Sequence, residues 1–182
     1  MVGPTVQDSL FAILLRFRRY QFVFSADLSK MYRQVRVDPS SVNFQRIFWR
    51  ERPTDPLKVF GLTTMTYGTA SAPFLATRTL VQLAEDEQET FPIGAKILRE
   101  NFYIDDCLCG FETLDEAAQA INELRGILEK GGFSIHKWCS NSQQLLDLVP
   151  KNEWEKQAEI SYSNVNQDIR INVGTQTRSI PI

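Results

Sequence analysis

The sequence NFYIDDCLCG, residues 101–110, places two adjacent carboxylates, Asp105 and Asp106, between an aromatic-aliphatic run and a second apolar run. Carboxylates are costly to bury, so a pair in a hydrophobic stretch needs a stabilising partner. The apolar residues on both sides predict a β-hairpin with Asp105 and Asp106 at its tip. Because Asp is also common in surface turns, this stretch alone leaves an ordinary polar turn open.

The residues that flank this hairpin predict a helix on each side. Residues 95–102, AKILRENF, have helical character and lead into the hairpin. After the hairpin, Thr113 and Glu116 have the spacing of a capping box. The helix that they begin carries four apolar residues on one face: Ala117, Ile121, Leu124 and Leu128. A Gly-Gly pair ends this helix, and residues 133–138, FSIHKW, predict a further strand.

The first part of the chain predicts a helix and then a strand that ends in a carboxylate. Thr5 and Asp8 are spaced as a capping box, and helical apolar spacing continues into the basic segment RFRRY. Residues 22–28, FVFSADL, predict a strand whose side chains alternate between two faces. One face carries Phe22, Phe24, Ala26 and Leu28, and the other carries Val23, Ser25 and Asp27.

Further elements lie between this strand and the hairpin. Residues 43–50 and 58–65 predict two strands, and residues 69–86 predict a helix with Pro73 near its start. The order of elements predicts an α+β fold, a mainly antiparallel sheet with helices on one face. This order is close to the ferredoxin-like split βαβ pattern.

In this fold the strand of Asp27 lies beside the hairpin of Asp105 and Asp106. Three clustered negative charges repel one another, and a bound cation is the usual resolution. Magnesium prefers hard oxygen ligands and takes one or two carboxylates together with phosphates and water. Two such ions roughly 4 Å apart activate an attacking oxygen and neutralise a leaving group. The three aspartates therefore predict a Mg²⁺ site, which Mn²⁺ could also occupy.

Composition and charge exclude few classes of protein. The chain has 182 residues, and no apolar run reaches the roughly 18–20 residues of a membrane span, so we expect no membrane partner. Three Cys argue against a disulfide framework and favour a reducing compartment. Residues 1–60 carry ten Lys or Arg against five Asp or Glu. Arg16, Arg18 and Arg19 in this part could contact phosphates or simply be solvated.

Four segments resemble, in chain order, the palm motifs of reverse transcriptases. They are SADLSKMYRQV (25–35), MTYGTASAPF (65–74), FYIDD (102–106) and GGFSIHKWCSN (131–141). The sequence is most similar to the polymerase of Bel/Pao-type LTR retrotransposons, since VGPTVQDSLFAILLRFRRY before the first motif and KWCSN in the last are typical of that group. The resemblance covers about residues 1–150 and implies an RNA-directed DNA polymerase, which is a nucleotidyltransferase.

The resemblance also implies roles for individual residues. Asp27 and Asp105 match the two metal-binding aspartates, and Asp106 matches their neighbour near the primer 3′ end. These three are therefore the expected catalytic and metal-binding residues. Tyr32 matches the aromatic steric gate, whose ring leaves no room for a 2′-hydroxyl and so selects deoxynucleotides. A core aromatic is the alternative for Tyr32.

Three further residues are expected to bind substrate. Gly68 matches the motif glycine that lets the backbone lie against nucleotide and template, because glycine has no Cβ. Tyr67 precedes it, where retroviral enzymes usually carry Gln and LTR retrotransposons more often an aromatic residue. Lys137 resembles the lysine of the fourth motif, which protonates the departing pyrophosphate. A solvated surface lysine is the alternative for Lys137.

The histidine and the cysteines are expected to be structural. His136 is the only histidine, and in this family the metal assists deprotonation. With Cys107, Cys109 and Cys139 it offers the ligand types of a zinc site. We expect Cys107 and Cys109 instead to be small apolar fillers on one side of a hairpin strand.

The resemblance divides the chain into a palm with partial fingers, residues 1–150, and a divergent or poorly ordered tail, residues 151–182. No segment of this sequence resembles the family's upstream finger hairpin or its thumb, so we expect little processive activity from the isolated chain. The chain is expected to be a fragment of a polyprotein with ribonuclease H, integrase and protease domains, or a decayed gene copy. Expected partners are a primed RNA or DNA template and deoxynucleoside triphosphates, in the cytoplasm or in virus-like particles.

Two other classes of function stay open. The first is a non-catalytic descendant that binds nucleic acid or protein. The second is the palm of an RNA-dependent RNA polymerase, which shares the carboxylates. Tyr32 argues against the second class, because those enzymes need room for the 2′-hydroxyl.

Overall fold

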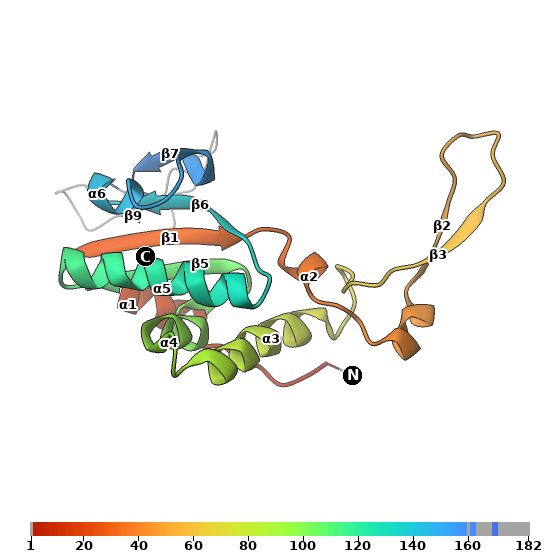
Figure 1. Ribbon diagram of the computed structural model, residues 1–182, viewed down its shortest axis with the longest axis horizontal. Coiled ribbons are helices and arrows are strands. Elements are labelled where there is room, and N and C mark those ends of the chain that lie inside the picture. The colour runs from red at the N-terminus through yellow and green to blue at the C-terminus, as the bar shows by residue number, and fades with distance from the viewer. Residues whose placement is uncertain (1, 160, 163–168, 171–182) are drawn as a thin grey trace.

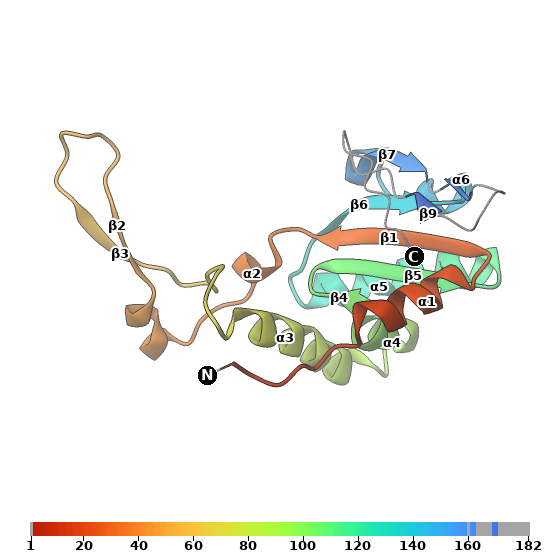
Figure 2. The ribbon, with the colours of Figure 1, turned by 180° about the vertical axis from the view of Figure 1, so that it is seen from behind.

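The computed structural model describes residues 2–159, 161–162 and 169–170. Figures 1 and 2 show the arrangement of its elements from two sides. The helices are α1 (Leu10–Arg18), α2 (Met31–Gln34), α3 (Ala72–Glu87), α4 (Pro92–Glu100), α5 (Leu114–Lys130) and α6 (Gln143–Leu146), with 3₁₀ turns at Pro39–Phe44 and Lys151–Glu153. The strands are β1 (Phe22–Leu28), β2 (Arg46–Trp49), β3 (Lys58–Gly61), β4 (Phe102–Tyr103), β5 (Asp106–Phe111), β6 (Ile135–Ser140), β7 (Trp154–Glu159), β8 (Ser161–Tyr162) and β9 (Ile169–Arg170).

Five strands form the central sheet in the order β4-β5-β1-β6-β7, with β5, β1, β6 and β7 labelled in Figure 1 and β4 in Figure 2. β1 lies between β5 and β6 and runs antiparallel to both, and β4 pairs antiparallel with β5. Only β7 of these strands runs parallel to its neighbour, β6. The predicted α+β fold with a largely antiparallel sheet is confirmed, and β1 forms over the predicted residues at the centre of this sheet.

Helices cover one face of the sheet and, in part, the other. The larger core lies between the sheet and α3, α4 and α5, where Phe24 and Leu28 of β1 are buried. The four apolar residues predicted on one face of α5 are all buried there: Ala117, Ile121, Leu124 and Leu128. On the opposite face, Ile13 and Phe17 of α1 pack in a second cluster with Val23. The helix layer is therefore where we expected it, and α1 adds cover to one end of the other face.

The two predicted capping boxes have different outcomes. At α5, Thr113 Oγ1 accepts a hydrogen bond from the Glu116 N–H at 3.3 Å, and Glu116 Oε2 accepts one from the Thr113 N–H at 3.1 Å, which confirms this box. At α1, the box of Thr5 and Asp8 is wrong. Ser9 caps the helix instead, because its hydroxyl accepts the Ala12 N–H at 3.3 Å, while the Asp8 carboxylate pairs with an arginine.

β2 and β3 form a separate two-stranded ribbon that projects away from the sheet in both views (Figures 1 and 2). Strands were predicted over residues 43–50 and 58–65, and both are present but shorter. The first is shortened because Asp38 accepts the Ser40 N–H at 2.8 Å and starts a 3₁₀ turn that runs to Phe44. All residues of both strands are exposed.

Other element boundaries shift by a few residues. α3 begins at Ala72, near the proline, and α4 begins at Pro92 and ends before β4. β7 continues the sheet past residue 150, and the domain boundary there stays a prediction. Most of the expected tail lies outside the described residues. No helix in residues 2–159, 161–162 and 169–170 is long and apolar enough to cross a membrane.

Candidate active site

Asp27 and Asp106 face each other across two neighbouring strands. Asp106, the first residue of β5, is the cross-strand partner of Asp27 near the end of β1. The Leu28 N–H donates to the Asp105 carbonyl at 2.9 Å, so the adjacent pair, Asp27 and Asp106, is a non-hydrogen-bonded pair. Such pairs have Cα atoms about 4.5 Å apart and side chains on one face. The register of the sheet therefore sets these two carboxylates side by side.

The hairpin that carries Asp105 turns at Ile104 and Asp105, between β4 and β5. Ile104 has a φ of 59°, which β-branched residues rarely adopt. In the part of the chain that the structure describes, the other non-glycine residues with positive φ are Lys30 at 48° and Lys137 at 54°. All three lie beside the aspartates in sequence or in space, and strained backbone of this kind clusters at functional sites.

Two side chains from β6 contact Asp27. Lys137 Nζ donates to Asp27 Oδ2 at 2.9 Å, and this hydrogen bond raises the pKa of Lys137. His136 lies directly opposite Asp27 in the register. Its Nδ1 is 2.8 Å from the Asp27 carbonyl oxygen and 3.5 Å from Oδ1, so the Nδ1–H donates to that carbonyl. The Asp27 carboxylate is therefore held and partly neutralised by β6.

The pKa of the Asp106 carboxyl group is raised by its surroundings. Displacement of water by the surrounding protein is the largest cause that raises the pKa of Asp106, followed by the negative charges of Asp105 and Asp27, and Lys137 opposes the rise. Asp106 nevertheless keeps an exposed surface. Asp105 and Asp27 thus repel the charged form of Asp106 at a solvent-exposed position, and a bound cation would relieve this repulsion.

Tyr32 and Tyr67 form an aromatic pair near the hairpin. Their ring centroids are 4.8 Å apart and the rings are tilted by 54°. Tyr32 is 9% exposed and Tyr67 is 56% exposed, so Tyr67 is the outer member of the pair. Burial, the charge of Asp105 and the neighbouring Tyr67 raise the pKa of Tyr32. Gly68 follows with a φ of 83° and open space where a Cβ would be.

The donor set fits a hard divalent cation, because carboxylate oxygens are the ligands that Mg²⁺ and Mn²⁺ prefer. Within residues 2–159, 161–162 and 169–170, no three His, Cys, Asp or Glu side chains are close enough to enclose a metal ion as they stand. The possible zinc ligands are divided by the sheet, since Cys107 and Cys109 lie in the larger core and Cys139 in the cluster under α1. The prediction that Cys107 and Cys109 are buried apolar fillers is confirmed.

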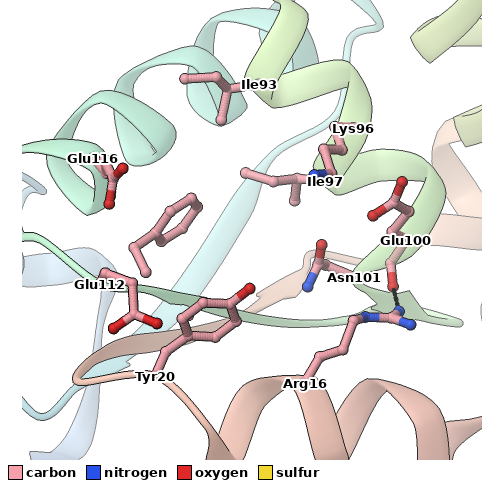
Figure 3. A pocket seen from close by; sticks show the side chains of 11 residues that line it. Arg16, Tyr20, Ile93, Lys96, Ile97, Glu100, Asn101, Glu112 and Glu116 are labelled. Carbon is pink, nitrogen blue, oxygen red and sulfur yellow. Dashed lines mark hydrogen bonds between the residues drawn. The ribbon is translucent and has the colours of Figure 1, made fainter.

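The basic residues of α1 have partners within the chain. Arg16 binds the Asp8 carboxylate at 2.8 Å. It also donates to the Glu100 carbonyl, a contact that Figure 3 shows. The Arg19 guanidinium lies 5.6 Å from the centroid of the Tyr20 ring. Arg16 is thus engaged by contacts within the chain, while its side chain stays 32% exposed.

Figure 3 also shows the pocket of about 390 Å³ that Arg16 helps to line, between α1, α4 and β5. Side chains of both charges line it, including Lys96 and Glu112. Two other pockets, of about 620 and 370 Å³, lie beside Arg33 near the β2–β3 ribbon. The aspartates line none of these three pockets.

Sequence reasoning missed two glutamines that brace the site. The Gln34 side chain donates to the Ser29 carbonyl and accepts the Ser134 N–H at 3.1 Å, which ties the loop after β1 to the start of β6. Gln7 Oε1 accepts the Ile104 N–H at 3.0 Å. The Gln34–Ser134 and Gln7–Ile104 bonds each join residues about a hundred positions apart, so no local sequence signal could have indicated them.

The fold is similar to solved structures of one class of polymerase. The foamy viral protease-reverse transcriptase in complex with an RNA/DNA hybrid matches with a TM-score of 0.57 and 22% identity over 74% of this chain and 16% of that chain. The same protein in its dRH form with ds DNA matches with a TM-score of 0.57 and 21% identity over 74% and 21% of the two chains. The Prototype Foamy Virus Protease-Reverse Transcriptase CSH mutant matches with a TM-score of 0.58 and 18% identity over 74% and 16%.

No family model and no curated protein matches the sequence. The chain spans 16–21% of the length of the viral proteins that it resembles in structure. At 18–22% identity the likeness concerns the fold. The chain therefore has a reverse-transcriptase-like fold, with the aspartates grouped at one end of its central strands.

Proposed function

We propose that this chain carries the catalytic palm of an RNA-directed DNA polymerase, a nucleotidyltransferase from the polyprotein of a Bel/Pao-type LTR retrotransposon. The observation that carries the proposal is the Asp27–Asp106 pair on neighbouring strands, with Asp105 in the adjoining turn, within a reverse-transcriptase-like fold. The motifs that resemble the family lie on the elements that form this site. The viral neighbours bind an RNA/DNA hybrid and ds DNA, and we propose a primed template as partner of this chain too.

In this proposal Asp27, Asp105 and Asp106 hold Mg²⁺ or Mn²⁺. The bound cations would supply neutralisation of the triphosphate charge and activation of the primer 3′-oxygen. Burial, and then repulsion from Asp105 and Asp27, raises the pKa of Asp106, and a bound cation would relieve the repulsive part. Lys137 carries a proton at Nζ beside Asp27 and donates it to the departing pyrophosphate.

The tyrosine pair would select the sugar of the incoming deoxynucleoside triphosphate. The ring of Tyr32 would meet a 2′-hydroxyl, and the open space at Gly68 would let the backbone approach the nucleotide. Replacement of Tyr32 by Val or Ala should then admit ribonucleotides. An unchanged preference for deoxynucleotides in a folded Tyr32→Val variant would remove the gate role and reopen the RNA polymerase alternative.

The remaining parts of the proposal concern the whole element. Residues 1–150 would be the palm with partial fingers, and residues 151–182 a divergent tail. Ribonuclease H, integrase and protease domains would belong to the same polyprotein, which would act in the cytoplasm or in virus-like particles. Since phosphate contacts supply much of the affinity for nucleic acid, we expect weak, non-processive extension by these residues alone.

Primer extension tests the proposal directly. The chain is incubated with poly(rA)/oligo(dT), dTTP and Mg²⁺ or Mn²⁺, beside an Asp105→Asn variant that keeps the size of the side chain. We expect extension that the variant abolishes. Equal extension by both proteins would point to a contaminating polymerase and remove the assignment. Mn²⁺ titration in parallel shows whether the aspartates bind the cation when extension is too weak to measure.

One observation favours a second candidate, a nucleic-acid or protein-binding module without catalysis. The 2.9 Å ion pair with Lys137 satisfies Asp27 without any metal ion. A module of this kind would bind a primed template and show no Mn²⁺ affinity that depends on Asp27 or Asp105. The catalytic proposal predicts the opposite result in the same titration.

A further inference from the structure

Ile104 holds the turn that carries the carboxylates in an unfavourable backbone conformation. Its φ of 59° belongs to the left-handed region, where a β-branched side chain is disfavoured. Glycine is the usual residue for such a position. The next residue is Asp105, so any relaxation of Ile104 would move that carboxylate and the start of β5 at Asp106. The pairing of β4 with β5 on either side of the turn opposes this relaxation, and a contact from outside the hairpin would add to that restraint.

Gln7 supplies such a contact. Its side-chain Oε1 accepts the hydrogen bond that the Ile104 N–H donates, at 3.0 Å. Gln7 is half-buried and lies in the segment before α1. The bond joins residues that are far apart in sequence, and it contacts the hairpin at the residue whose φ is strained.

The segment that carries Gln7 is itself fastened on both sides. Asp8, the next residue, binds Arg16 at 2.8 Å, and Arg16 donates to the Glu100 carbonyl at the end of α4 (Figure 3). Gly3 lies directly against the Phe74 ring of α3, where an added Cβ would come within 2.1 Å of a ring carbon. Gln7 is therefore presented to the hairpin from a fixed position.

We propose that Gln7 is a positioning residue that holds Ile104 in its left-handed conformation and thereby sets the places of Asp105 and Asp106. Gln7 touches neither substrate nor metal in this proposal and acts only through the hairpin backbone. This proposal gives residues 2–7, VGPTVQ, a structural role. The proposed polymerase function does not by itself give these residues a role. Its consequence for cation binding rests on that proposed function, whereas its consequence for the hairpin does not.

The test compares two kinds of variant in the full chain. Gln7→Leu and Gln7→Ala remove the acceptor, and Gln7→Glu keeps it. Gln45→Leu is the matched control, because Gln45 is a half-buried glutamine whose side chain donates to the Leu62 carbonyl at 3.3 Å, beside the ribbon. Two readouts are used, hydrogen exchange of the Ile104 amide by NMR in metal-free protein, and the Mn²⁺ dissociation constant.

We expect Gln7→Leu and Gln7→Ala to speed exchange of the Ile104 amide and to weaken Mn²⁺ binding about three- to tenfold, the range that loss of one hydrogen bond produces. Gln7→Glu and Gln45→Leu should keep the slow exchange. In an Ile104→Gly background the same Gln7 substitutions should have a much smaller effect on Mn²⁺ affinity, because glycine needs no restraint at this φ.

Unchanged exchange and affinity in folded Gln7→Leu would overturn the proposal, as would an equal effect of Gln7→Leu in both backgrounds. Failure of both Gln7→Leu and Gln7→Ala to fold would also overturn it, since Gln7 would then be needed for global stability. If the unmodified chain binds no Mn²⁺ at its aspartates, the proposed polymerase function fails. The exchange of the Ile104 amide still decides the role of Gln7 in that case.

Discussion

β1 and the β2–β3 ribbon are both built from apolar and aromatic residues, yet they lie in opposite surroundings. Phe24 of β1 is 1% exposed, whereas Phe48 of β2 is 73% exposed. β1 has a hydrogen-bonded strand on each side and helices over its larger core, and the ribbon has only its own two strands (Figures 1 and 2). Isolated two-stranded ribbons are at best marginally stable, so apolar content alone does not decide which region is rigid.

This difference bears on the candidate site. Asp27 lies on the doubly bonded strand and Asp106 on its neighbour, so the sheet determines their separation. The ribbon contributes none of the aspartates or tyrosines. Changes in the ribbon should therefore leave the carboxylates in place, and changes in the sheet should not.

The largest expected effect compares the two phenylalanines. Phe24→Ala removes a ring that stacks near Phe111 and Trp138, and it should lower the free energy of unfolding by about 3–5 kcal/mol. Phe48→Ala should change it by no more than about 0.5 kcal/mol. Urea unfolding followed by circular dichroism measures both values. A similar loss at Phe48 would show that the ribbon is packed in solution and would break the comparison.

A smaller loss of stability is expected when alanine replaces a glycine that is packed between two helices. A Cβ at Gly94 of α4 would lie 2.9 Å from the Glu123 carbonyl oxygen of α5. Backbone cannot move aside cheaply, so Gly94→Ala should cost about 1–3 kcal/mol. In Gly61→Ala, at the end of β3 in the ribbon, the close atom belongs to the Val42 side chain, which can shift. Equal losses in thermal unfolding of the two variants would contradict a rigid helix layer.

The capping box of α5 gives a further, smaller prediction. Thr113→Ala removes the hydroxyl that accepts the Glu116 N–H and should lower the free energy of unfolding by about 1 kcal/mol. Thr113→Ser keeps the acceptor and should recover most of this loss. In Thr113→Ala, hydrogen exchange of the backbone amides in the first turn of α5 should be faster than in the unmodified chain. No change in stability with Thr113→Ala would mean that packing alone fixes this end of the helix.

The smallest effect at neutral pH concerns the thiol of Cys139, which influences stability only in alkaline solution. Burial, and then the charge of Glu155, raises the pKa of Cys139 from 9.0 to about 11. Between pH 9 and 11 the unfolded chain releases this proton while the folded chain retains it, so stability falls as the pH rises. Unfolding at several pH values should show a shallower fall for Cys139→Ala. Identical slopes for the two proteins would mean that water reaches this strand.

Local signals in the sequence predicted several elements well, although they did not predict β7, which lies in the expected tail. Alternation along residues 22–28 predicted β1, and the three-residue spacing of Thr113 and Glu116 predicted the start of α5. A local signal failed where two candidate caps competed. Thr5 and Ser9 both precede α1, and the salt bridge of Asp8 with Arg16 left the cap to Ser9.

The contacts that complete the site could not be predicted in this way. The bonds of Asp27 with His136 and Lys137 depend on the register of β1 against β6, and the bond of Gln7 with Ile104 depends on the path of the segment before α1. The exposure of the ribbon could not be predicted either, because an apolar sequence pattern does not indicate which other elements cover a strand. The aspartates were found from sequence because their motif is local, and their surroundings were not.

The central position of β1 has a consequence for synthesis of the chain. β1 is synthesised before both of its partner strands, since Phe24 pairs with Cys109 and Ser140, which lie much later in the sequence. Pairings between distant segments form slowly, and an unpaired apolar strand is prone to aggregate meanwhile. The contacts between α3 and α4 and between α4 and α5 join neighbours in sequence and can form first. A nascent chain that stops before β6 would thus expose one edge of β1 and lack the lysine that neutralises Asp27.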